Sequence, residues 1–285
     1  MAERILSLSQ PNSLSQLRLL VAVARKDWRI FWRYPLNAVS SVLQPIVWLT
    51  PIYFMGLAFS VNGKAVGFAG YSGTTDYMSF ALIGSVLVSY INAVFWGMGY
   101  SLKEDMDVGV LESNWLAPAS RLLIMTGRTF TSLVITTITS LVTLLVAGWL
   151  FGFQIIGNLW AALLTALPML LGLYGFGFAF AALVLVMREA NTMVDVSSFL
   201  VQTFSGLSYP VNALPRYLLP IALALPLTYG FDAVRGLLLG TRTLLPIPLE
   251  IGLMLIFMVA MILLGVWIFR RLEFRVRMRG TLGQH

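Results

Sequence analysis

The acidic residues of this sequence are its main candidates for catalysis or metal binding. Paired carboxylates can act as general acid and base or bind a hard cation. One cluster lies within 103–121 and consists of Glu104, Asp105, Asp107 and Glu112. Other acids stand in or beside long apolar runs, namely Asp76, Asp195, Asp232 and Glu250. The sequence has no cysteine, its one histidine is His285, and it contains no G-x-x-x-x-G-K-[ST] phosphate loop. We therefore predict no catalytic residue and no metal site, and expect the cluster to be the solvated face of a loop.

The composition indicates which class of protein holds these acids. Of the 285 residues, 58% are hydrophobic and 11% are charged. The mean hydropathy is +0.84, and soluble domains carry about 25% charged residues. Long uncharged apolar runs add to this deficit, so we predict an all-α polytopic membrane protein in contact with lipid. We attribute the net charge of +7 to the positive-inside bias of membrane proteins, and we expect no nucleic-acid partner.

The apolar runs divide a single transmembrane domain, residues 1–285, into six predicted spans. They are 37–60, 77–100, 124–151, 159–187, 192–207 and 248–269. Residues 61–76 are rich in Gly and Ser and are predicted to form a loop. Residues 14–33 place arginines beside a face of Trp, Phe and Leu, which is typical of an amphipathic helix in the membrane interface. The pattern fits an anchor and a docking surface equally well.

Two polar features within the spans have alternative interpretations. The third span carries a stripe of hydroxyl side chains, Thr129, Ser132, Thr136, Ser140 and Thr143. Such a stripe either packs against another helix or lines a substrate path, and we favour packing because small polar residues are common at transmembrane helix contacts. Asp195 lies one turn into the fifth span. It is either a functional charge or a polar group near enough to water that its burial costs little free energy.

The segment from Ser205 to Gly236, the proline-rich segment, is apolar but does not fit a span. It contains Pro210, Pro215, Pro220 and Pro226, and its longest proline-free run is far below the ~20 residues of a crossing. With six spans and an inner N-terminus, 15 of the 19 Lys and Arg residues lie on the inner side. A seventh span would move the arginine-rich tail outside, against the positive-inside bias. We therefore predict that 208–236 is an outer re-entrant helical hairpin between spans five and six, hinged at Pro215 and Pro220.

Two segments resemble the permease subunits of ATP-binding-cassette (ABC) transporters of the type-2 exporter kind. The first segment is 103–121, the loop on the inner side between the second and third spans. Its matching residues are Asp107, Gly109, Leu111, Glu112, Pro118 and Arg121, with Asp107 where Glu is common and Val110 where Thr is common. In the proline-rich segment they are Ser205, Gly206, Tyr209, Pro210, Leu214, Pro215, Pro226, Leu227, Thr228, Tyr229, Asp232 and Arg235. The six-span layout and the amphipathic helix extend the resemblance over nearly the whole chain.

The resemblance implies a transport subunit rather than an enzyme. It implies a dimer with a second permease copy, identical or different, and separate ABC ATPase subunits that bind ATP and Mg, so that this chain itself binds no cofactor. Residues 103–121 would form a cytoplasmic coupling loop, and ATPase contacts would come from Arg25, Trp28, Arg29, Glu104, Asp105, Asp107, Gly109, Leu111, Glu112 and Trp115. The protein would lie in a prokaryotic cytoplasmic membrane with both termini in the cytoplasm.

The resemblance also implies a translocation path along the second and fifth spans and an outer gate. Path candidates are Ser89, Tyr90, Asn92, Trp96, Ser198, Gln202, Phe204 and Tyr209. Gate candidates are Pro210, Leu214, Pro215, Pro226 and Tyr229. We expect a drug- or lipid-like amphiphile as cargo because the predicted path is mostly apolar and aromatic. The alternatives are a permease for a polysaccharide or glycolipid and, in a different class, a lipid-modifying membrane enzyme.

Overall fold

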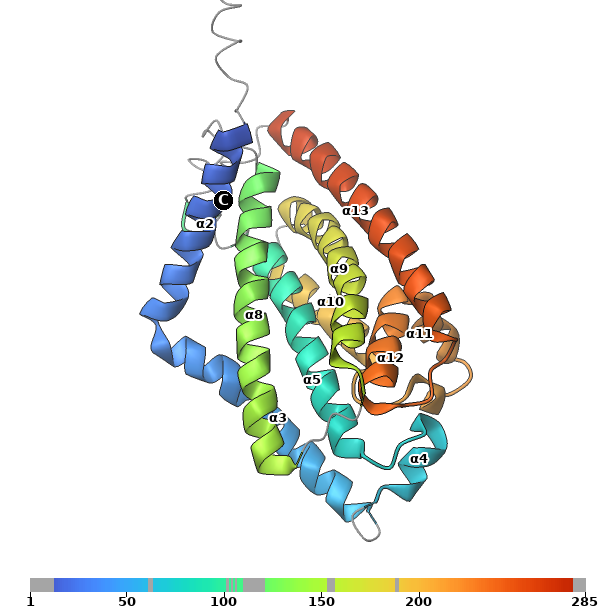
Figure 1. The fold of residues 1–285 in the computed structure, drawn as a ribbon. Helices are drawn as coiled ribbons and strands as arrows, with labels where there is room; N and C mark the ends of the chain where they lie inside the picture. Colours follow the sequence, from blue (N-terminus) through green and yellow to red (C-terminus); the bar gives the residue numbers. More distant parts are fainter. Residues whose placement is uncertain are drawn as a thin grey trace, which may run out of the picture.

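The fold was taken from a computed structural model, which describes residues 13–60, 64–100, 103, 105, 107–109, 121–152, 157–187 and 190–278. The regular structure of these residues is helical (Figure 1). The helices are α2 (Ser13–Arg33), α3 (Pro35–Ala58), α4 (Val66–Ser72), α5 (Tyr77–Val94), α8 (Arg121–Phe151), α9 (Leu159–Met187), α10 (Ala190–Phe204), α11 (Leu219–Ala224), α12 (Pro226–Leu239) and α13 (Ile247–Met278). A π-helical turn, η1 (Phe95–Tyr100), continues α5, and a 3₁₀ turn, η2 (Val211–Ala213), follows α10.

Five of the described helices are long and apolar enough to cross a membrane: α3, α5 with η1, α8, α9 and α13. They coincide with five of the six predicted spans. The remaining prediction, 192–207, falls on α10, whose 15 residues are fewer than the ~20 that a straight crossing needs. The protein is therefore a multi-pass helical membrane protein, and the sixth crossing stays a prediction.

The structure departs from the sequence prediction most clearly at α4, at the end of α13 and within the proline-rich segment. The predicted loop 61–76 contains the short helix α4, which ends at Gly73 in the left-handed conformation (φ 77°). The last helix, α13, continues to Met278 rather than 269, because arginine is a good helix former and its charge suits a helix C-terminus. The proline-rich segment breaks at Leu225–Pro226, and Pro220 lies within the first turn of α11, where a proline needs no backbone donor.

The interior of the bundle is formed by α5 and α9. More than half of the most apolar stretch of each is buried, against 6% for α3 and 11% for α13. In Figure 1, α13 runs along α9, and α8 lies beside α5. The apolar outer faces of α3 and α13 are left for lipid or another protein, as expected of helices at the rim of a membrane domain.

Helix α3 runs at an angle to α2 and contacts both α5 and α8. The chain turns at Tyr34, and Pro35 occupies the first helical position of α3. Helix α2 packs on the first turns of α8, where a Cβ added to Gly127 would lie 3.2 Å from Cγ1 of Val23. The result is the V of α2 and α3 at the left of Figure 1, with α3 crossing α8 toward the lower end of the bundle.

Helices α4, α11 and α12 gather at the end of the bundle away from the start of α2, where α13 begins (Figure 1). The 6 residues of α11 and 14 residues of α12 span about 9 Å and 21 Å at 1.5 Å per residue. Neither reaches the ~30 Å of a hydrocarbon core. The proline-rich segment is thus a pair of short helices, consistent with the predicted hairpin.

The contact between α9 and α13 depends on two glycines, and this generates a prediction. A Cβ on Gly265 would lie 1.8 Å from the carbonyl oxygen of Gly175, so the helix backbones would have to separate. We expect Gly265→Ala to lower the free energy of unfolding by about 1–3 kcal/mol through overpacking. The measurement is the melting temperature of the purified chain in one detergent.

The matched control for this prediction lies on the same helix. A Cβ on Gly252 would meet nothing within 4 Å, so Gly252→Ala should leave the melting temperature unchanged or raise it slightly. Equal melting temperatures for the two variants would contradict the close approach of α9 and α13.

Candidate functional site

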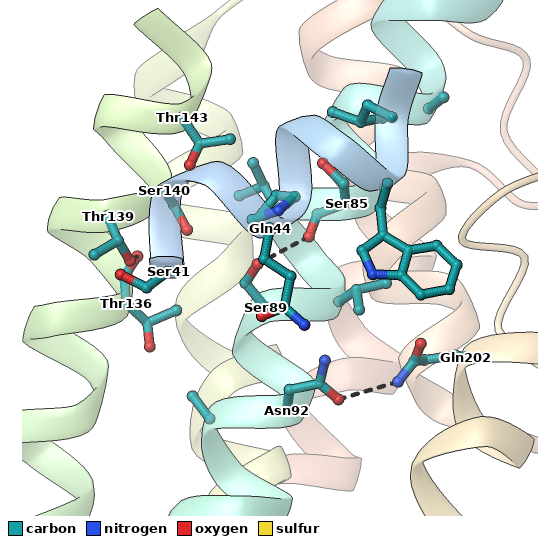
Figure 2. Close-up of a pocket in the computed structure, with 18 of the residues that line it drawn as sticks. Ser41, Gln44, Ser85, Ser89, Asn92, Thr136, Thr139, Ser140, Thr143 and Gln202 are labelled. Carbon is teal, nitrogen blue, oxygen red and sulfur yellow. Dashed lines mark hydrogen bonds between the residues drawn. The ribbon is translucent and has the colours of Figure 1, made fainter. Parts of the chain in front are cut away.

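The main cavity of the described chain lies between α3, α5 and α8 and reaches the end of α10. Its volume is about 690 Å³. Figure 2 shows α8 on one side, α5 at the back and α3 in front, with Gln202 of α10 at the opposite edge. The volume is within the ~300–1,000 Å³ typical of sites for small organic ligands. The cavity is therefore the first candidate for a site that binds cargo.

The wall contributed by α8 is the hydroxyl stripe noted in the sequence. Ser132, Thr136, Ser140 and Thr143 line the cavity, together with Thr139. Thr129 does not; its backbone carbonyl accepts a hydrogen bond from the Tyr174 hydroxyl at 3.2 Å. Most of the stripe thus faces a cavity, which favours the interpretation as a path over helix packing alone.

The opposite edge of the cavity is a contact between α5 and α10. The Gln202 amide nitrogen donates to the Asn92 side-chain oxygen at 3.1 Å (Figure 2). Ser89 lines the same wall one turn along α5. The structure therefore brings together three of the predicted path residues, Ser89, Asn92 and Gln202.

The other predicted path residues do not line this cavity. Three are engaged elsewhere: the Tyr90 hydroxyl donates to Thr137 at 2.9 Å, the Ser198 hydroxyl to the backbone carbonyl of Asp195 at 3.1 Å, and the Tyr209 hydroxyl to the carbonyl of Thr203. Trp96, which is 38% exposed, and the half-buried Phe204 also lie outside the lining.

Sequence reasoning missed the contribution of α3. Ser41, Gln44 and Trp48 line the cavity, and Ser85 adds a further hydroxyl from α5. The signal available in the sequence was the i, i+3, i+7 spacing of Ser41, Gln44 and Trp48, which places them on one face of a helix. Which face turns inward depends on the direction that α3 takes after Tyr34.

The proline-rich segment is attached to the bundle by a buried arginine. Arg235 of α12 is 2% exposed, and its guanidinium donates to the carbonyl oxygen of Gly206 at 2.6 Å and to that of Leu207. Its central carbon lies 3.6 Å from the centre of the Phe80 ring, a cation–π distance. Arg235 therefore joins α12, the end of α10 and α5 at one point.

The predicted gate residues shape the turns around this attachment. Pro210 and Leu214 flank η2 in extended conformations, Pro215 follows, and Pro226 starts α12. The Tyr229 hydroxyl donates to the carbonyl of Leu223 at 2.9 Å, across the break between α11 and α12. These residues fix the backbone path, and their role as a gate stays a prediction.

The acids near the apolar runs serve mainly as hydrogen-bond acceptors for the backbone. Asp76 caps α5 by accepting from the Ser79 N–H at 2.9 Å. Asp232 accepts from the Leu244 N–H, and Glu250 from the Leu245 N–H at 3.0 Å. The side chain of Asp195 is exposed. Among the described residues there is no group of three acids or histidines placed to hold a metal ion.

A second charged junction lies where α2 meets α8. Arg128 forms a two-point ion pair with Asp105, at 3.0 Å and 3.1 Å, and both side chains are mostly buried. Burial raises the pKa of Asp27 on α2 above its usual value, and the charges of Lys26 and then Arg128 offset part of this effect. Lys103 pairs with Asp107 at the surface. The start of the predicted coupling loop is thereby joined to α8.

The predicted ATPase contacts lie partly outside the described residues. Arg25 and Arg29 are exposed on α2, and Trp28 is 36% exposed. Gly109 is exposed with a left-handed φ of 72°. Glu104, Leu111, Glu112 and Trp115 fall outside the described residues, as does most of 103–121.

Comparison with known sequences identifies the family of this chain. The sequence model of the ABC-2 type transporter family matches residues 18–239, from α2 to the end of α12. The chain belongs to the ABC-2 type transporter family. The match covers every element that lines the cavity and the whole proline-rich segment, so both lie within the ABC-2 transporter domain of this chain.

Curated relatives of this ABC-2 chain carry transport names. The chain is 26% identical over 244 residues to the probable doxorubicin resistance ABC transporter permease protein DrrC of Mycobacterium tuberculosis, in both strain CDC 1551 and strain H37Rv. The matched region covers 83% of this chain and 84% of the relative. The relatives are permease proteins, that is, transport subunits, which agrees with the resemblance noted in the sequence.

The attachment through Arg235 generates the second prediction. A Cβ on Gly84 would lie 2.0 Å from the Leu207 carbonyl oxygen and 2.5 Å from a terminal guanidinium nitrogen of Arg235. Gly84→Ala should therefore loosen the proline-rich segment. Ser205 is 1% exposed, so a cysteine placed there in this cysteine-free chain reports the loosening. Maleimide labelling of Ser205→Cys should become about tenfold faster for each 1.4 kcal/mol by which closure is weakened.

The control is Gly70→Ala in α4, at the same end of the bundle, where an added Cβ meets nothing within 4 Å. It should leave the labelling rate unchanged. A labelling rate that Gly84→Ala also leaves unchanged would rule out Arg235 as the attachment of the segment.

Proposed function

We propose that this chain is the permease subunit of an ABC exporter and forms the path for a drug- or lipid-like amphiphile. The observation that carries the proposal is a cavity of about 690 Å³ lined by α3, α5, α8 and α10 within an ABC-2 domain. Its wall combines hydroxyl and amide groups with apolar side chains such as Leu49 and Ile52, as an amphiphile requires. The drug-resistance name of the relatives supports the same class of cargo.

The energy for transport would come from a separate ATPase. In this proposal ATP and Mg bind to ABC ATPase subunits that dock on 103–121 and on the exposed basic face of α2, both in the cytoplasm. The Arg128–Asp105 pair supports this arrangement because it passes any displacement of the loop to α8, one wall of the cavity. Charged hydrogen bonds in mostly buried positions resist being pulled apart.

A second permease copy would complete the path. Helix α10 exposes Val196, Phe199 and Leu200, with exposed fractions of 53%, 66% and 47%. These side chains lie on the helix that contributes Gln202 to the cavity. We place the dimer contact there, with an identical or a different permease, and assign the proline-rich segment to the outer gate in a prokaryotic cytoplasmic membrane.

A lipid-modifying enzyme is less consistent with the site. Such an enzyme needs an acid–base pair or a metal beside its substrate. The described residues that line the cavity include no ionisable side chain. We therefore retain transport as the function of the cavity.

The third prediction tests the path. In inverted membrane vesicles that contain the chain and its ATPase, ATP should drive uptake of fluorescent amphiphiles, tested as a panel with neutral, cationic and anionic heads. Gln202→Ala removes one wall hydrogen bond and should lower uptake about twofold to tenfold, with ATPase co-purification unchanged. The control, Thr126→Val, lies on an exposed face of α8 outside the cavity. ATP-independent uptake, or activity without any bound ATPase, would contradict the proposal.

The fourth prediction tests the coupling junction. Arg128→Asp sets two negative charges together and removes charged hydrogen bonds worth about 1.5–3 kcal/mol each. ATP-driven uptake should fall while the cavity stays intact, because the pair lies away from its lining. The double variant Arg128→Asp with Asp105→Arg restores opposite charges and should recover part of the uptake. If ATP-driven uptake by the double variant is no higher than that of Arg128→Asp, the ion pair does not contribute to coupling.

A further inference from the structure

The cavity wall is polar but carries no charge. Its hydroxyl and amide side chains come from all four helices, and none of the described residues that line it is Asp, Glu, Lys or Arg. An ion moved into such a site loses hydration and gains no opposite charge, which is costly at membrane depth. A charged head group is therefore a poor match for this wall.

Four of the hydroxyls that line the wall donate to a carbonyl of their own helix and keep their acceptor sites free. Ser41 donates to the carbonyl of Ala38 at 2.8 Å, and Ser85 to that of Leu82 at 2.8 Å. Ser89 donates to the carbonyl of Ser85 at 3.1 Å. Thr139 does the same within α8, to the carbonyl of Thr136 at 3.1 Å. A hydroxyl that donates to its own helix can still accept hydrogen bonds through its oxygen lone pairs. Such hydroxyls therefore match a ligand that carries hydrogen-bond donors.

Two further groups lack part of their hydrogen bonding. The Ser140 hydroxyl oxygen is buried and has no partner among the described residues, and it lines the cavity. The Gln202 amide donates one N–H to the Asn92 oxygen. The Gln202 side-chain oxygen can then accept a hydrogen bond, and the Asn92 NH₂ group can donate one. A buried hydroxyl without a partner, such as that of Ser140, favours a ligand that supplies the missing hydrogen bond.

The extent of the wall fits several ligand groups rather than one. From Thr136 to Thr143 the α8 hydroxyls extend over eight residues, about 10 Å along the helix axis at 1.5 Å per residue. Figure 2 shows Thr136, Thr139, Ser140 and Thr143 along one side of α8, with Ser85 and Ser89 on α5. Trp48, which also lines the cavity, is 70% exposed, so the cavity reaches the surface of the chain at α3.

We propose that the cavity binds an amphiphile with an uncharged head that carries several hydroxyl groups, as in a sugar-headed lipid, with the apolar body leaving past Trp48. This inference rests on the proposed function as an amphiphile permease and specifies its cargo. It departs from the sequence expectation of a mostly apolar and aromatic path, because Trp48 is the one aromatic residue among the described residues of the lining.

The test compares three probes with one tail. Dodecyl glucoside, dodecyltrimethylammonium and dodecyl sulfate, each with a photoreactive diazirine in the chain, are bound to the full chain in phosphatidylcholine nanodiscs. Labelled peptides are located by mass spectrometry, and empty nanodiscs correct for partitioning. The glucoside should label α3, α5 and α8 and reach half-saturation at a concentration about tenfold lower than either ionic probe.

Two variants with a matched control assign the preference to the wall. Thr136→Val with Thr143→Val keeps the side-chain shape and removes two hydroxyls, and should weaken glucoside binding at least about fivefold. Thr131→Val is the control, because Thr131 is buried on α8 and bonded to its own helix but lies outside the cavity. Asn92→Asp adds a carboxylate of the same shape and should shift preference toward the ammonium probe.

Each outcome decides the inference. Equal labelling by the three probes, or an ionic probe bound most tightly by the unmodified chain, would overturn it. So would Thr136→Val with Thr143→Val binding like the unmodified chain. Because binding is measured without ATP, a chain that binds the glucoside yet supports no ATP-driven uptake would contradict the proposed function alone. Uptake of amphiphiles regardless of head would contradict this inference alone.

Discussion

The buried guanidinium of Arg235 is the contact on which the end of the bundle depends. Helix α10 stops after 15 residues, and the carbonyls that follow, on Gly206 and Leu207, have no next turn to bond them. Unpaired backbone groups are costly in an apolar setting. Arg235 supplies donors to both carbonyls and packs on Phe80. The guanidinium fits there because Gly84 has no side chain. A helix too short to cross is thus completed by a side chain 29 residues later.

The same requirement explains how a polar cavity is tolerated between apolar helices. Four of its hydroxyls, on Ser41, Ser85, Ser89 and Thr139, donate to carbonyls of their own helices, so these donors stay paired in the empty wall. These hydroxyls keep acceptor sites without a partner, and an acceptor without a partner is less costly than a buried charge. In the proposed path, such a wall would hold a hydroxylated head by hydrogen bonds alone, with no ion pair to break on release.

The long helices were predictable because their apolar runs are long and their breaks carry Gly, Pro or charge. The ends were less so: α13 continues through Arg270 and Arg271 because charge ends a membrane crossing and not a helix. Within the site, Asn92 and Gln202 were predicted from the family resemblance. The α8 stripe was recognised from its spacing, although the sequence analysis favoured helix packing for it over a path. The α3 wall was not predicted, since the turn at Tyr34 sets its direction through contacts that no local pattern encodes.

The π-helical turn at Phe95–Tyr100 divides one span into two registers. In an α-helix, positions four apart share a face, which would place Trp96 beneath Asn92 in the cavity. A π turn bonds i to i+5 and shifts the faces that follow, and Trp96 lies outside the lining. Removing one residue from this turn would rotate the rest of the helix, with the start of the 103–121 loop, by about 100° relative to the cavity. The π-helical turn therefore fixes the direction in which the loop from Lys103 leaves the helix relative to the cavity wall.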